Sequence, residues 1–168
     1  MKEIIINDDN LDIKDVDKYS LKARALLYKD DSILLANYNG IHLLPGGKLE
    51  SNENKLEALQ RELKEETGIL YNIDELTELF VLRYYQKNYL TIDNKILNRL
   101  VTTYFYVAKY KGIDLNNTKR TKNEIEGNFK LELIDIDDLS YSKENNNPRK
   151  KYFDRELQEV IKVYKKVM

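Results

Sequence analysis

The chain carries the stretch Gly47-Lys48-Leu49-Glu50-Ser51-Asn52-Glu53, then Asn54 through Gln60, then Arg61-Glu62-Leu63-Lys64-Glu65-Glu66-Thr67-Gly68-Ile69. Leucines at positions 56, 59 and 63 recur at the spacing of a helix that packs one face on a core. Gly68 stands where a helix commonly ends, because glycine adopts the left-handed conformation without strain. We therefore expect a helix from Asn52 to Thr67, preceded by the glycine pair Gly46-Gly47.

Three glutamates, Glu62, Glu65 and Glu66, are three and four residues apart, so they project from one side of this helix. Like charges at these positions repel each other, and a counter-cation removes the repulsion. Clustered carboxylate oxygens suit Mg²⁺ or Mn²⁺. The absence of cysteine and the presence of one histidine argue against zinc. Taken alone, however, an acidic run usually marks a solvated helix face.

The glycines Gly46 and Gly47 precede the helix, so we expect them in a loop at its N-terminus. Free N–H groups and the positive end of the helix dipole favour phosphate at such a place, and a loop carbonyl can also reach a metal. A phosphate cradle beside a divalent cation and a carboxylate that deprotonates water can hydrolyse a P–O–P bond. Pro45-Gly46-Gly47 alone would indicate no more than a turn.

The whole segment resembles the Nudix box at every position: Gly47, Glu53, Arg61-Glu62-Leu63, Glu65-Glu66 and Gly68-Ile69 have its spacing. The resemblance implies an α/β/α sandwich with a mixed sheet. It also implies that Glu62 and Glu66 bind the metal, that Glu65 completes the metal shell or positions water, and that Gly47 lends its carbonyl.

By the same resemblance, Glu53 assists the site, and Arg61 orients the glutamates by bidentate ion pairing. Members of the family differ in the carboxylate that acts as general base. Here the candidates are Glu62 within the box and Glu124 or Glu126 on the segment before a late strand. Plain surface charge is the alternative interpretation of the latter two.

Length and composition fit one domain over residues 1–168, since the chain is 42 % hydrophobic and 34 % charged. A net charge of −1 gives no general attraction to nucleic acid, although Arg149-Lys150-Lys151 is locally basic. No segment approaches the roughly 20 apolar residues of a membrane span. We expect a cytoplasmic protein without a membrane partner.

The remaining pattern alternates strands and helices. A polar linker is expected at about residues 143–150, before a C-terminal helix from Lys151 to Lys166 whose apolar stripe packs on the sheet or forms a homodimer contact. The hairpins and helices favour a mixed sheet covered on both faces. Strands are expected at Lys2–Ile6, Leu21–Tyr28, Ser32–Asn37, Ile41–Leu44, Glu78–Leu90, Leu97–Tyr110 and Asn128–Ile134.

The substrate implied is a nucleoside diphosphate linked to another group, as in a nucleoside triphosphate, a dinucleoside polyphosphate or a nucleotide sugar. Tyr85 can stack on a base, and Arg99 can meet a distal phosphate. No proline occurs between Pro45 and Pro148, which disfavours ADP-ribose because pyrophosphatases for it often carry one after the box. A non-catalytic nucleotide sensor is the alternative. An isopentenyl diphosphate isomerase would need the cysteine that is missing.

Overall fold

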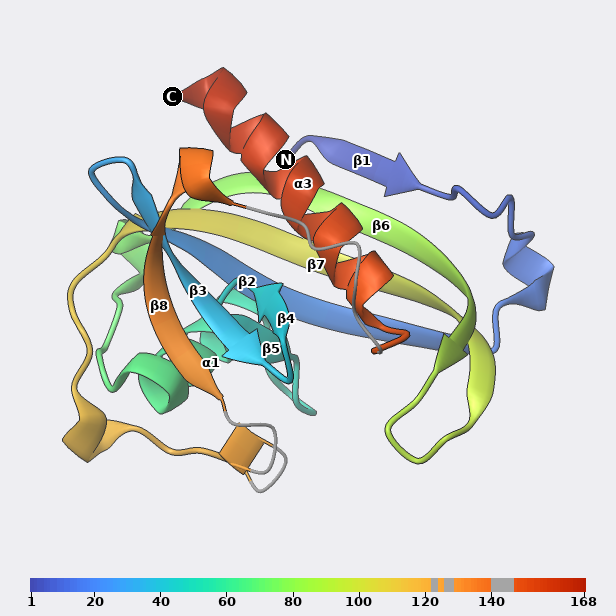
Figure 1. Ribbon diagram of the computed structural model, residues 1–168, viewed down its shortest axis with the longest axis horizontal. Coiled ribbons are helices and arrows are strands. Elements are labelled where there is room, and N and C mark those ends of the chain that lie inside the picture. The colour runs from blue at the N-terminus through green and yellow to red at the C-terminus, as the bar shows by residue number, and fades with distance from the viewer. Residues whose placement is uncertain (122–123, 126–128, 140–146) are drawn as a thin grey trace.

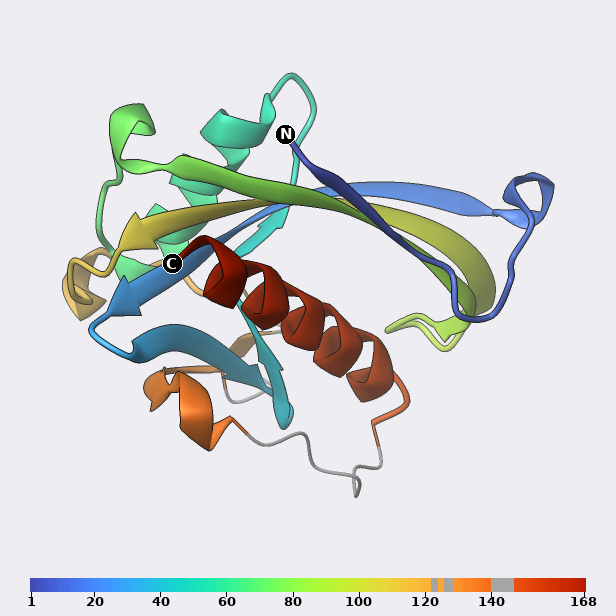
Figure 2. The same cartoon turned by 90° about the horizontal axis from the view of Figure 1, so that it is seen from above.

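The computed structural model describes residues 1–121, 124–125, 129–139 and 147–168. In these ranges one mixed sheet has helix α1 on one face and helix α3 on the other (Figure 1, Figure 2). This arrangement confirms the expected α/β/α sandwich with a C-terminal helix. The helices are α1 (Lys55–Thr67) and α3 (Lys150–Val167), and the strands are β1 (Glu3–Ile6), β2 (Lys18–Lys29), β3 (Ser32–Tyr38), β4 (Ile41–Leu43), β5 (Gly46–Lys48), β6 (Thr77–Leu90), β7 (Ile96–Lys109) and β8 (Lys130–Asp135).

The strand order is β1-β6-β7-β2-β3-β4, while β5 pairs with β2 and β8 pairs with β3. β1 lies at an edge of the sheet and runs parallel to β6. The long strand β2 runs parallel to β7, which places Lys18 opposite Arg99 in the register. β6 and β7 form an antiparallel hairpin, closed by a hydrogen bond of 2.8 Å from the Thr91 N–H to the Lys95 carbonyl.

Two separate cores hold the layers together because side chains alternate between the faces of a strand. On one face, Leu26 and Phe105 pack with Leu157 and Val160 of α3. On the other face, Ala23 and Leu27 of β2 belong to a core with the α1 leucines, for example Leu59. The predicted apolar stripes of both helices therefore pack on the sheet, and the homodimer contact stays a prediction.

The start of α1 differs from the expectation. The helix begins at Lys55 and not at Asn52, because Asn54 is its N-cap: the Asn54 side chain accepts a hydrogen bond of 2.9 Å from the Glu57 N–H. Asn52 has a φ of 68°, which is incompatible with the helix. Gly68 ends the helix as predicted, with a φ of 78°.

The predicted linker at residues 143–150 falls largely outside the described residues, because 140–146 are not among them. The C-terminal helix agrees with its prediction to within one residue at each end. In the part of the chain that the structure describes, no helix is long and apolar enough to cross a membrane.

Candidate active site

The glycine pair lies in strand β5, which pairs with β2 so that Gly46 is opposite Arg24 and Gly47 is opposite Ala23. Both positions require glycine because of close approaches. A β-carbon at Gly46, where φ is +136°, would stand 2.2 Å from the Ala23 carbonyl oxygen. A β-carbon at Gly47 would stand 2.5 Å from Oε1 of Glu62. The glycines therefore let β5 lie directly between β2 and the acidic side of α1.

The expected phosphate cradle at the helix N-terminus is wrong. The glycines contact Glu62 and Glu66 in the second half of α1, about 10 Å from its first turn at 1.5 Å per residue. The chain turns back after β5, where the Glu53 N–H donates to the Glu50 carbonyl at 3.1 Å. β5 consequently runs beside the helix instead of leading into it, and the side chain of Asn54 occupies the helix start.

Glu66 is the most deeply buried acid of the segment, with 5 % of its surface exposed. Its Oε2 accepts a hydrogen bond of 3.0 Å from the Gly46 N–H. Burial raises the pKa of Glu66 well above its ordinary value, and repulsion by Glu62 adds to the rise. Burial also raises the pKa of Glu62, against hydrogen bonding from Arg61, which lowers it. A nearby cation would stabilise the ionised form of both carboxylates.

Arg61 connects the other acids of the segment. Its Nε and Nη2 donate to the two carboxylate oxygens of Glu53 at 2.7 and 3.0 Å, a bidentate pair. Its Nη1 donates to Glu62 at 3.0 Å and to Glu65 at 3.3 Å. The hydrogen bond from Arg61 lowers the pKa of Glu53. The guanidinium thus lies between three carboxylates, while its Nη2 also donates to the Lys48 carbonyl at 3.0 Å.

Arg24 supports the glycine strand from the opposite face of the sheet. It is buried, and its Nη1 donates to the Leu44 carbonyl at 2.7 Å and to the Gly46 carbonyl at 3.4 Å. The sequence reasoning missed this residue. Its signal was a charged side chain within the apolar run Ala23–Leu27, where a buried charge needs specific partners.

The donor set fits a hard divalent cation, because carboxylate and carbonyl oxygens are the ligands such ions prefer. Among the described residues, no three acidic or histidine side chains are already grouped so as to hold a metal ion. Arg61 forms ion pairs with Glu62 and Glu65, so an ion would compete with the guanidinium for the same oxygens. Glu62, Glu65, Glu66 and the Gly47 carbonyl remain the candidate ligands.

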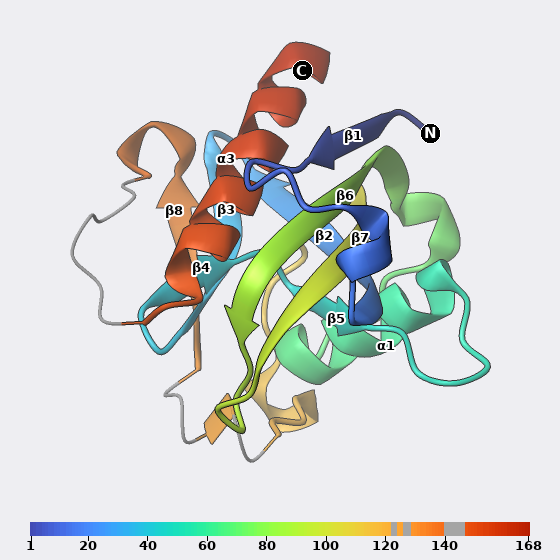
Figure 3. The same cartoon turned by 90° about the vertical axis from the view of Figure 1, so that its right-hand side faces the viewer.

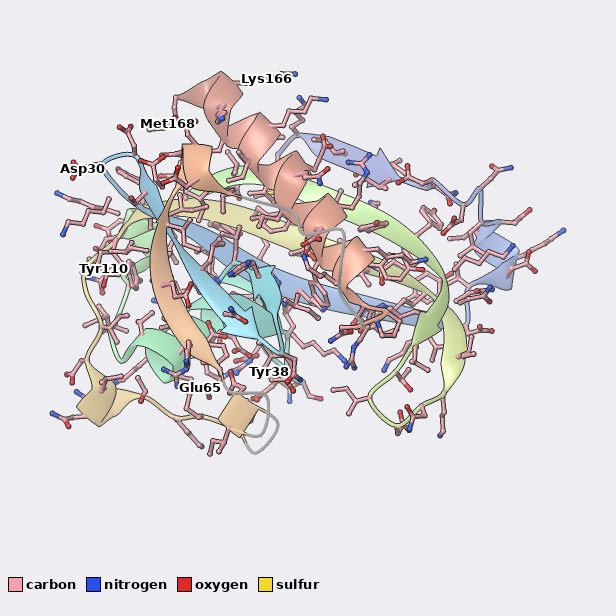
Figure 4. The ribbon with its side chains drawn as sticks, viewed as in Figure 1. Asp30, Tyr38, Glu65, Tyr110, Lys166 and Met168 are labelled. Atoms are coloured by element: carbon pink, nitrogen blue, oxygen red, sulfur yellow. The ribbon has the colours of Figure 1, made fainter. Side chains whose placement is uncertain are left out.

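A cavity of about 480 Å³ opens beside these carboxylates. Figure 4 shows Tyr38, from the end of β3, and Glu65, from α1, at the same end of the molecule. Tyr85 and Arg99 do not line this cavity, and Glu126 is outside the described residues, whereas Glu124 is part of the wall. The lining residues are Tyr38, Leu43, Gly46, Glu50, Arg61, Glu62, Glu65, Glu66, Ile92, Lys119, Arg120, Thr121, Glu124 and Phe129.

One wall of the cavity comes from the segment between β7 and β8, of which the sequence indicated only the candidate bases Glu124 and Glu126. Its backbone is tied to α1 by a hydrogen bond of 2.7 Å from the Lys119 N–H to the Glu65 carbonyl. Arg120 lies 4.2 Å from the ring centroid of Phe129, and its Nη2 reaches the Glu66 carbonyl at 3.5 Å. No local pattern indicates the two contacts with α1, because each joins residues more than fifty positions apart.

Comparison with known proteins agrees with this geometry. A family model for the NUDIX domain matches residues 18–157, which is most of the chain. No curated protein matches the chain significantly. Many solved structures do. A Nudix hydrolase from Nitrosomonas europaea has 20 % identity and a TM-score of 0.57, with 88 % of each chain covered.

Two further structures have the same fold. The MutT Nudix hydrolase from Burkholderia pseudomallei has 20 % identity and a TM-score of 0.51, covering 81 % of this chain and 95 % of its own. The Nudix domain of NrtR from Shewanella oneidensis, solved with ADP ribose, has 17 % identity and a TM-score of 0.57, covering 95 % and 96 %. The fold and the family match define a hydrolase that acts on phosphorus-containing anhydrides. The chain belongs to the Nudix family.

Proposed function

We propose that the enzyme is a pyrophosphohydrolase that depends on Mg²⁺ or Mn²⁺ and cleaves a nucleoside diphosphate linked to another group. The observation that carries the proposal is the composition of one cavity. Glutamates 62, 65 and 66 line it together with Arg61, with two further cations, Lys119 and Arg120, and with aromatic side chains. A metal held by the acids and a phosphate chain near the cations would fit the same space.

The acids have separate roles in this proposal. Glu62, Glu65 and Glu66 hold the metal together with the Gly47 carbonyl, and Arg61 and Glu53 keep the helix carboxylates in position. When bound, a divalent cation neutralises phosphate charge and makes phosphorus more open to attack. The Gly46 N–H orients the buried Glu66 carboxylate.

In the reaction, the oxygen of a water molecule forms a bond to phosphorus as the P–O bond of the anhydride breaks. A carboxylate accepts the proton of the water, and the released phosphate carries the electron pair of the broken bond. Two carboxylates of the described cavity remain candidates for the base, Glu62 on α1 and Glu124 on the segment before β8. Glu124 also accepts a hydrogen bond of 2.7 Å from the Thr121 N–H, which holds its side chain in place.

The apolar part of the cavity lining suits a nucleoside. Its volume lies within the range of about 300–1,000 Å³ that is usual for small-molecule sites. Tyr38, Leu43, Ile92 and Phe129 give this cavity its apolar surface, and one face of the Phe129 ring is covered by Arg120. Tyr38 is therefore the better placed ring for stacking on a base.

The test is hydrolysis of a panel of nucleoside triphosphates, dinucleoside polyphosphates and nucleotide sugars with Mg²⁺ or Mn²⁺. We expect release of a nucleoside monophosphate, loss of activity in EDTA, and a rate at least a hundredfold lower in Glu62→Gln. Glu57→Gln on the same helix is the control, because glutamine keeps the capping contact of Glu57. Glu124→Gln decides between the two candidate bases: a rate at least a hundredfold lower assigns the base to Glu124, and a nearly normal rate assigns it to Glu62.

Turnover on no member of the panel with either metal would contradict the proposal. Tight nucleotide binding under those conditions would then identify the chain as a sensor.

A further inference from the structure

A group of cations lies on the face of the sheet that α3 covers, away from the acidic side of α1. Lys22 and Arg99 are each 7 % exposed, whereas Lys18 and Lys48 are exposed at the surface beside them. The strand register brings them together, with Lys18 opposite Arg99 and Lys22 opposite Lys48. Figure 3 shows β5 beside α1, with α3 at the opposite face of the sheet.

These cations have no matching acids. In the described ranges, no carboxylate forms an ion pair with Lys18, Lys22, Lys48 or Arg99. Arg99 donates to Gln86 at 2.5 Å and lies 3.4 Å from the ring centroid of Tyr89, both uncharged partners. Glu156 of α3 is the acid that influences both Lys22 and Arg99, so positive charge is in excess.

Lys22 shows the imbalance most clearly. Its Nζ lies 5.5 Å from the ring centroid of Phe153 on α3, and no hydrogen bond to another described residue satisfies it. Burial lowers the pKa of Lys22 well below its ordinary value, and repulsion by Arg24 and Arg99 lowers it further. A buried cation without a charged partner destabilises a fold, and an anion that binds here would offset part of that cost.

We propose that Lys18, Lys22, Lys48 and Arg99 form a binding site for a phosphate group, separate from the candidate metal site. The two sites lie on opposite sides of β5, because Gly47 faces Glu62 of α1 while Lys48 faces the α3 side together with Lys22. The exposed side chains of Lys18 and Lys48 form its entrance, and the phosphate oxygens receive hydrogen bonds from the lysine ammonium groups. Arg99 supplies charge beneath them.

Two sources can provide this phosphate. It is either a group at the remote end of the substrate, whose phosphoanhydride lies across β5, or a separate free anion. The first source rests on the proposed function, whereas the second does not.

The binding test uses inorganic pyrophosphate with EDTA present and chloride holding the ionic strength constant, followed by calorimetry. We expect Lys22→Met and Lys48→Met to weaken pyrophosphate binding at least tenfold. Lys109→Met, which changes an exposed lysine at the far end of β7, should bind like the wild type. Lys48 is exposed, so its replacement leaves the fold intact even where Lys22→Met does not.

The second arm compares KM for two substrates, one whose remote end carries an additional phosphate and one whose remote end is uncharged. A rise in KM for the phosphorylated substrate alone, in Lys22→Met and Lys48→Met, identifies the phosphate as part of the substrate. Weaker pyrophosphate binding without any change in KM identifies a free anion. Equal pyrophosphate affinity in the wild type and both variants overturns the site, whatever the hydrolytic activity proves to be.

Discussion

Gly47 lies against the carboxylate of Glu62, with 2.5 Å between Oε1 and the point where a β-carbon would stand. This contact joins a strand on the sheet to the acidic side of α1. It sets where the Glu62 carboxylate can lie, because Arg61 holds the same oxygen from the other side at 3.0 Å. The glycine is therefore part of the geometry of the candidate site and not only a flexible residue.

Gly47→Ala should lower kcat strongly, by about a hundredfold, because the new methyl group displaces the Glu62 carboxylate by more than the tolerance of a catalytic arrangement. The fold should persist, since the atoms in the way belong to the end of a flexible side chain. Steady-state kinetics measures the effect, with circular dichroism for the fold. Gly112→Ala is the control: nothing lies within 4 Å of its added carbon, so activity should stay normal despite a φ of +100°.

Arg61→Lys should reduce activity although it keeps the positive charge. Lysine has one ammonium group and cannot reproduce the bidentate contact with Glu53 while it also reaches Glu62 and Glu65. We expect a loss of at least tenfold in kcat/KM at saturating Mg²⁺. Arg155 of α3 forms ion pairs with Asp8 and Glu159, away from the candidate site, so Arg155→Lys should leave kcat/KM unchanged. Full activity of Arg61→Lys would show that the planar guanidinium is not required.

The stability of the enzyme should fall as the pH rises from 10 towards 12, in part because of Tyr71. Burial raises the pKa of Tyr71 to about 12, against a value of about 10 in the unfolded chain. The contribution of Tyr71 to the free energy of unfolding is therefore fully present below pH 10. Above that pH the tyrosine of the unfolded chain loses its proton first, which stabilises the unfolded state relative to the folded state. Urea unfolding measured between pH 9 and pH 12 should show a shallower decline in Tyr71→Phe than in the wild type. Parallel curves would exclude this linkage.

Tyr106→Phe should leave the free energy of unfolding unchanged or raise it by up to about 1 kcal/mol. The Tyr106 hydroxyl is buried and has no hydrogen-bond partner among the described residues. Removing it therefore removes the cost of burying a polar group without a hydrogen bond. Tyr152→Phe is the matched comparison, because the Tyr152 hydroxyl donates to the Lys87 carbonyl at 2.6 Å. That variant should lose about 1 kcal/mol in urea unfolding. A clear destabilisation by Tyr106→Phe would contradict the assignment.

Local patterns predicted a large part of the fold. Leucine spacing, the C-terminal glycine of α1 and the alternating strands depend on interactions between near neighbours, which a sequence displays directly. The start of α1 was placed three residues too early because Asn54, and not Asn52, caps it, and both residue types occur at helix starts. Strand β5 was missed because its pairing with β2 depends on residues more than twenty positions away.

By itself, the sequence determined that Glu62, Glu65 and Glu66 share one side of a helix, because the helical repeat sets the direction of each side chain. Tertiary structure alone decided where that helix meets the glycines, which is along its second half and not at its start. It also decided that Tyr38, Lys119 and Phe129 join the acids in one cavity, and that four cations gather behind β5. Those relationships arise from strand pairing and layer packing over long separations, and no short stretch of residues encodes them.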